Sequence, residues 1–167
     1  MLAELKAIEI RDTIVSEIDT WWAKGANDAV SSMWNVDQAI QDGDEDPAIL
    51  GRRVWVGIEP DGLNRFPVDR GHDEIDVPIR VVVFERYNTA TVAGSPTVAW
   101  GDDLFKFTAA LKDWLSDAKR TDWPDELTDF PPESSEYAFL FDPDRYASLN
   151  TWVSAFVVSY RGEVSEP

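Results

Sequence analysis

The stretch EIDVPIRVVVFERYN, residues 74–88, constrains the fold of this 167-residue chain more than any other. Apolar side chains occupy every second position in it: Ile75, Val77, Ile79, Val81 and Val83. A period of two predicts a β-strand over residues 75–86 with one face in the core. Pro78 has no backbone N–H, and prolines in strands occur at edges, ends or bulges. We therefore expect the first half of this strand to lie at a free margin of its sheet, or to bend there.

Two longer segments have the apolar spacing of helices. Residues 2–22 carry an apolar stripe that includes Leu5 and Ile8, which predicts an amphipathic N-terminal helix. Residues 103–118 carry a second stripe, and Asp102 and Asp103 are expected to cap this helix. These two helices are the main helices that the sequence predicts.

Three more strands are expected. Residues 52–60, RRVWVGIEP, alternate in the same way and end at Pro60. EYAFLFDP and TWVSAFVVSYRGE, the latter at 151–163, predict a final pair. We interpret residues 23–51, 59–74, 88–102 and 121–135 mainly as connections, with a short helix near 28–40.

The resulting order is helix, strand, strand, helix, strand, strand. Strands that come in pairs indicate an α+β fold and not a parallel sheet built from βαβ units. We expect a single domain, residues 1–167, with a twisted, mostly antiparallel four-stranded sheet flanked by two main helices.

The charge balance limits the partners of the chain. Its 32 acidic and 15 basic residues give a formal net charge of −17. A polyanion repels nucleic-acid phosphate and anionic lipid, so ordinary DNA, RNA or membrane binding is disfavoured. The chain has no cysteine, which excludes disulfides and thiolate chemistry. We expect no membrane segment and no signal peptide, and a protein that stays in the cytoplasm where it is made.

The sequence offers little catalytic chemistry. The single histidine, His72, lies in the polar stretch DRGHDEID, where a solvated side chain is more common than a general base. DGDEDP from Asp42 begins like a calcium loop, but Pro47 and Arg53 occupy positions where that loop needs glycine and glutamate. We expect no catalytic residue, metal or cofactor. The enzymatic alternative is a metal-dependent hydrolase that uses His72 and nearby carboxylates.

Several aromatic residues lie outside any periodic segment: Trp34, Phe66, Trp100, Trp123 and Phe130. Such side chains either cover the core of their own subunit or anchor a neighbouring one, since tryptophan and tyrosine dominate interface hot spots. The sequence leaves both readings open.

The long N-terminal helix, the segment RVWVGIEPDGLNRF…EIDVPIRVVVFERY, the second helix and the closing TWVSAFVVSYRG together resemble one family. Over residues 1–162 the chain is similar to the tail terminator proteins of long-tailed bacteriophages and to related tail-completion and neck proteins. The resemblance implies a small α+β subunit of a hexameric ring, which caps the tail tube and joins it to the head. It also implies a place in the virion, with the tail tube protein and neck proteins as partners.

In such a ring, an acidic lumen would let DNA pass without binding it. The candidates for that lumen are Asp42, Asp44, Glu45 and Asp46. The candidates for subunit contact are Trp55, Pro78, Arg80, Glu85, Trp100 and Trp123. Two alternatives remain, a head-completion or stopper protein of the neck, and an acidic module that binds DNA-binding proteins by mimicking DNA.

Overall fold

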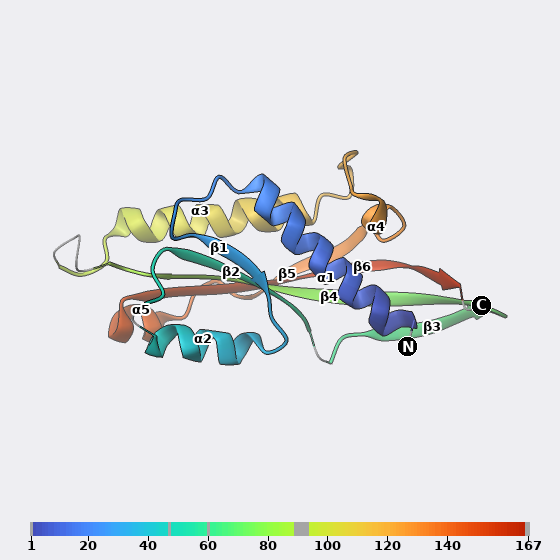
Figure 1. The fold of residues 1–167 in the computed structure, drawn as a ribbon, viewed down its shortest axis with the longest axis horizontal. Helices are drawn as coiled ribbons and strands as arrows, with labels where there is room; N and C mark the ends of the chain where they lie inside the picture. The colour runs from blue at the N-terminus through green and yellow to red at the C-terminus, as the bar shows by residue number, and fades with distance from the viewer. Residues whose placement is uncertain (1, 47, 60, 89–93, 166–167) are drawn as a thin grey trace.

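The computed structural model describes residues 2–46, 48–59, 61–88 and 94–165, which form an α+β fold around one mixed sheet (Figure 1). The strands are β1 (Ala29–Ser32), β2 (Arg52–Ile58), β3 (Asn64–Asp69), β4 (His72–Arg86), β5 (Pro132–Phe139) and β6 (Thr151–Ser165). The helices are α1 (Leu2–Trp21), α2 (Val36–Glu45), α3 (Val98–Leu115), α4 (Asp125–Thr128) and α5 (Pro143–Leu149). The strand order is β1-β2-β4-β6-β5, and β3 also pairs with β4.

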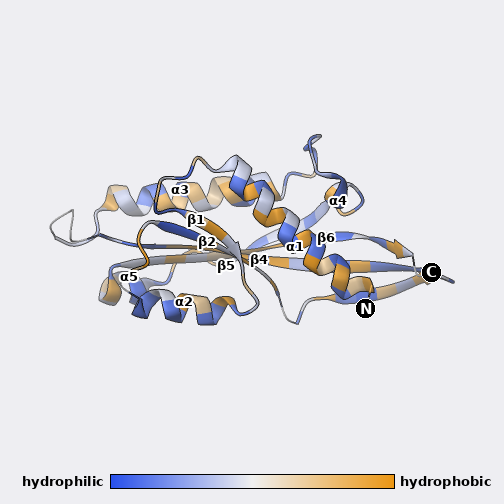
Figure 2. Ribbon diagram, in the orientation of Figure 1, coloured by the Kyte–Doolittle hydropathy of each residue, from blue (hydrophilic) through white to orange (hydrophobic). Residues whose placement is uncertain are grey.

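The sheet separates two cores. Helices α1, α3 and α4 cover one face, which we call the upper face, and α2 covers part of the other, the lower face (Figure 1). The alternation of β4 explains this division, since Ile75 to Val83 point upward at odd positions while Val82 and Phe84 point downward. Hydropathy follows the same division, with apolar positions on the helix faces turned to the sheet and polar positions outside (Figure 2).

The expectation of a free margin at Pro78 is wrong. Strand β4 is central, because it pairs with β6 on one side and with β2 and β3 on the other, and Pro78 is buried. Its carbonyl accepts a hydrogen bond from the Glu59 N–H at 3.0 Å, which puts the proline nitrogen on the same side. That side faces the break between the end of β2 at Ile58 and the start of β3 at Asn64. The missing N–H therefore costs the sheet no ladder hydrogen bond.

The sequence predicted too few strands and helices, since the described residues form six strands and five helices. All four predicted strands are present, but β1 and β3 were missed. Strand β1 pairs in parallel with β2, and α2 connects the two, so the fold contains one βαβ unit that strand grouping did not reveal. The four other strand pairs are antiparallel.

Two helix predictions also need correction. Helix α3 begins at Val98, where the Thr97 side chain accepts a hydrogen bond from the Trp100 N–H, so Asp102 and Asp103 lie inside the helix and do not cap it. The acidic stretch from Asp42 belongs to α2 and is not a loop; Pro47 lies outside the described residues. Gly43 allows this helix to approach the sheet, because a Cβ there would lie 2.9 Å from the Phe84 ring.

The longest feature of the sheet is the ladder between β4 and β6. It runs without a register shift from the pair of His72 and Ser165 to the pair of Arg86 and Thr151. At about 3.3 Å per residue, these fifteen pairs span roughly 45 Å. At one end, β3 forms the tip of the sheet together with residues 72–76 of β4 and 161–165 of β6, and we call this region the arm (Figure 1). The first turns of α1 pack on one face of the arm, where Ile75 and Val164 are buried, while all six residues of β3 remain exposed.

Candidate functional site

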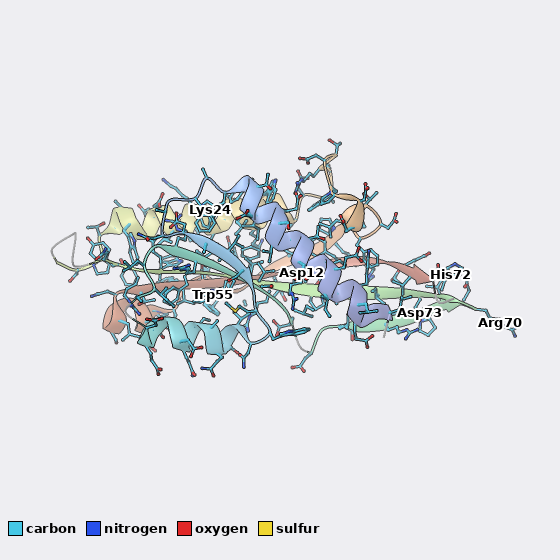
Figure 3. All side chains as sticks on the ribbon, viewed as in Figure 1. Asp12, Lys24, Trp55, Arg70, His72 and Asp73 are labelled. Carbon is cyan, nitrogen blue, oxygen red and sulfur yellow. The ribbon has the colours of Figure 1, made fainter. Side chains whose placement is uncertain are left out.

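The structure does not gather the six predicted contact residues on one surface. Trp55 and Pro78 are buried inside the subunit, so neither offers an exposed side chain to a neighbour. Trp55 lies between the sheet and α2 with its ring centroid 5.0 Å from that of Phe84 (Figure 3). It stabilises the lower core.

Arg80 and Glu85 lie on opposite faces of β4. Arg80 is on the lower face, half-buried, with Asp37 at 3.4 Å and Glu59 at 3.6 Å. It borders an open hollow of about 430 Å³ on the part of the lower face that α2 leaves uncovered. Glu85 is on the upper face, and Arg52 donates a hydrogen bond to it at 3.2 Å.

Trp100 and Trp123 both make contacts within their own subunit. The Trp100 Nε1–H donates to Glu85 Oε2 at 2.5 Å, and its ring packs edge-on against Tyr87. Burial raises the pKa of Glu85, although Arg52 and Trp100 both oppose the shift. Trp123 packs edge-on against Tyr160 and under the Arg120 guanidinium.

The other aromatic residues divide in the same way. Phe130 is buried in the upper core and is not an anchor. Trp34 remains 70% exposed and lies beneath the Arg11 guanidinium, 4.7 Å from the ring centroid. Phe66 is exposed on the arm, with Arg161 over its ring.

The four lumen candidates lie at the C-terminal end of α2. Asp44 turns toward the body, where the Arg145 Nε–H donates to it at 2.8 Å, so it is a poor lumen residue. The other three remain exposed: Asp42, Glu45 and Asp46. Asp42 and Asp46 also accept local hydrogen bonds from Gln38 and from the Ala48 N–H. No cluster of metal-ligating side chains occurs among the residues that the structure describes.

His72 lies at the tip of the arm and is exposed (Figure 3). Its Nδ1 is 2.7 Å from Asp69 Oδ1, and this hydrogen bond raises the pKa of the imidazole. The pair closes the two-residue turn formed by Arg70 and Gly71, in which Gly71 has a φ of 97°. The exposed position favours a role in turn geometry over catalysis.

We expect the His72 imidazole to titrate above its ordinary pKa of about 6.5. Because the folded value is raised, the stabilisation is fully present below the ordinary pKa and disappears as pH rises through the folded pKa. A proton NMR titration of the single histidine measures the midpoint directly. Asp69→Asn is expected to lower the midpoint toward the ordinary value, and an unchanged midpoint in this variant would show that Asp69 is not the cause.

The structure brings together a surface that the sequence prediction did not identify. An apolar groove of about 440 Å³ lies where the N-terminal part of α3 meets the end of β5 and the start of β6. Exposed side chains line it: Val98, Phe105, Leu140 and Phe141. Its aromatic members include Tyr146 and Trp152, and the Phe141 ring stacks on Trp152 with centroids 5.4 Å apart.

A sequence signal for half of this groove existed. Val98, Gly101, Asp102 and Phe105 follow helical spacing and form a second face of α3, separate from the core stripe. The remaining lining residues come from residues 140–152, and the folding of the sheet places them next to α3. The spacing of residues within one helix could not predict this contact between α3 and residues 140–152.

Comparison with known proteins adds no assignment, since no family model and no curated protein matches the chain. No helix in the described part of the chain is long and apolar enough to cross a membrane. The arm and the apolar groove are therefore the surfaces on which a functional proposal can be built.

Proposed function

We propose that this chain is a structural subunit of a ring at the head-proximal end of a phage tail, where it terminates the tail tube and joins it to the neck. The observation that carries the proposal is the arm. All six residues of β3 are exposed, and its large apolar side chains Phe66 and Val68 are 45% and 54% exposed. A region with exposed apolar side chains is typical of a subunit that contacts a neighbour.

The fold is compatible with the family that the sequence resembles. A sheet with helices on both faces forms the body, and the arm extends from one end of it (Figure 1). These features support a subunit that makes contacts by shape. The tail tube protein and the neck proteins are the proposed neighbours above and below the ring.

The net charge supports the proposed position on the DNA path. Six copies, the number implied by the resemblance, carry −102 formal charges at −17 each. Exposed acids such as Asp42, Glu45 and Asp46 would repel phosphate if they face the channel, so that DNA moves past without binding.

Electron microscopy of particles assembled without this protein tests the proposal. We expect overlong tails or tails that are not joined to heads, because nothing would stop the tube or connect it. Heads that leak DNA while tails have normal length would instead assign the chain to the stopper position. Normal joined particles would refute a role in the neck altogether.

A second experiment uses the purified protein. We expect closed rings in negative stain, alone or after addition of isolated tail tubes. The expected loss of those rings on deleting residues 65–72 would show that the arm is required. Retention of rings after the deletion would remove the observation that carries the proposal.

A further inference from the structure

The apolar groove has the composition of an unfilled protein contact. Val98 is 79% exposed, although it begins the helix that covers the upper core. Together with Phe105, Leu140 and Phe141 it concentrates exposed apolar side chains in one hollow. Exposed apolar clusters of this kind on a subunit mark interaction surfaces.

The arm offers matching side chains. Phe66 and Val68 are exposed on β3, which is an edge strand. Pro67 and the register shift between Pro67 and Asp69 interrupt that edge, and both features discourage the addition of another strand. The arm is therefore suited to dock through its side chains and not by extending a sheet.

One subunit cannot join its own arm to its own groove. The arm lies at the His72 end of the ladder between β4 and β6, and the groove residue Trp152 pairs with Glu85 near the opposite end. The ladder keeps the two ends roughly 45 Å apart. Any contact between them must therefore form between two molecules.

The charges at the two surfaces are complementary. Arg70 at the tip of the arm has no ion-pair partner among the described residues, in contrast to Arg65, which pairs with Asp73 (Figure 3). Asp102 borders the groove and likewise has no partner in the described ranges. In a chain of net charge −17, an unpaired arginine next to exposed apolar residues favours a site that combines an acid with an apolar hollow.

We infer that the arm of one copy docks in the apolar groove of a second copy, with Phe66 and Val68 in the hollow and Arg70 near Asp102. This inference rests on the proposed function, because it names the contact that would build the ring. The contact is heterologous, since two different surfaces meet. Such a contact gives a closed ring when its rotation closes and an open filament when it does not.

Disulfide trapping tests the inference without background, because the natural chain has no cysteine. Val68→Cys and Val98→Cys are made in separate chains, purified, mixed and oxidised. We expect a covalent dimer in the mixture and none from either variant alone, since each disulfide needs one arm and one groove. A chain that carries both substitutions is expected to give a ladder of covalent oligomers.

A matched control uses Glu126→Cys, an exposed position on α4. This helix lies toward the arm end of the β4–β6 ladder, because its C-cap residue Asp129 is next to Gly162. Mixed with Val68→Cys it is expected to give no covalent dimer. Equal trapping at Glu126 and at Val98 would show random collision and overturn the inference. Dimerisation of Val68→Cys alone would indicate arm-to-arm contact and would also overturn it.

Charge reversal tests the polar part of the contact. Arg70→Glu is expected to weaken self-association about threefold, and Asp102→Arg in the same chain is expected to restore it. Failure of the double variant to restore association would refute the pairing. Rings that form in the natural protein without trapping at Val98 would refute the inference and leave the proposed function standing. A protein that stays monomeric even with tail tubes would refute both.

Discussion

Replacing Phe84 by alanine is expected to lower the free energy of unfolding by about 3–5 kcal/mol. The Phe84 side chain is fully buried in the lower core and packs beside Trp55 beneath Gly43 of α2. The alanine would leave a cavity beneath α2, because the Phe84 ring lies directly under Gly43 of this helix. Urea unfolding followed by circular dichroism measures the change.

Phe105→Ala is the matched control for this prediction. Its side chain is exposed at the groove, so we expect a loss within about 0.5 kcal/mol. A loss of less than about 1 kcal/mol in Phe84→Ala would mean that α2 does not depend on this ring. The same control variant is informative for assembly, because it removes apolar surface from the groove without destabilising the subunit.

Gly43 gives a second test of the same contact. Gly43→Ala is expected to cost about 1–3 kcal/mol, because the added methyl group would lie 2.9 Å from the Phe84 ring and 3.1 Å from the Trp55 ring. In the Phe84→Ala background the methyl group has room, so most of this cost is expected to disappear. Additive effects of the two substitutions would contradict the close approach of α2 to the sheet.

Gly162→Ala is expected to have the second large effect, a loss near or above about 3 kcal/mol. An added Cβ would clash with the Asp129 carbonyl oxygen and would lie 2.8 Å from the Phe130 ring. The oxygen belongs to main chain that is held in place by the hydrogen bond from the Arg161 N–H to the Pro131 carbonyl. Neither neighbour can move without disturbing the junction of β6 with the segment after α4.

The control for Gly162 is Gly101→Ala in α3. The nearest atom to an added Cβ there is the Tyr146 hydroxyl at 3.7 Å, so the methyl group fits. Alanine is favoured over glycine inside a helix, and we expect a gain of about 0.5–1 kcal/mol. Thermal and urea unfolding of both variants should therefore shift in opposite directions. A loss in both would point to a general sensitivity to substitution and not to the contact with Asp129.

The sequence predicted the parts of the fold whose pattern is local. Strand β4 was found because its alternation continues over many residues. Helix α1 was found from its apolar spacing, but the predicted stripe is wrong in part, because Leu5 is exposed and Ala7, Ile10 and Ile14 are buried. Strand β1 has only four residues and depends on parallel pairing with β2, which no local pattern encodes. Strand β3 has all six residues exposed, so it has no alternation of burial to recognise.

Pro78 and Gly43 have structural roles that differ from those that the sequence suggested. Pro78 indicated a sheet edge, but the proline is accommodated by a break in the neighbouring strands, which lies elsewhere in the chain. Gly43 within DGDEDP indicated a turn, but this glycine lets a helix approach Phe84. In both cases the residue is explained by a neighbour in the tertiary structure that lies far away in the sequence.

The candidate site was the least predictable part. Indoles expected at an interface, such as Trp55, pack within the subunit, while the groove combines α3 with residues about 40 positions later. Residue type identified the kind of side chain that makes contacts. It could not identify which of these side chains remain uncovered once the chain folds.

The uninterrupted pairing of β4 with β6 has a geometric consequence. Both ends of the molecule are built on the same two strands, with no hinge or bulge between them. The angle between successive copies in a head-to-tail assembly would then be fixed by the intrinsic twist of this pair. Curvature, and with it the diameter of a ring, would be a property of the strands themselves and not of a flexible joint.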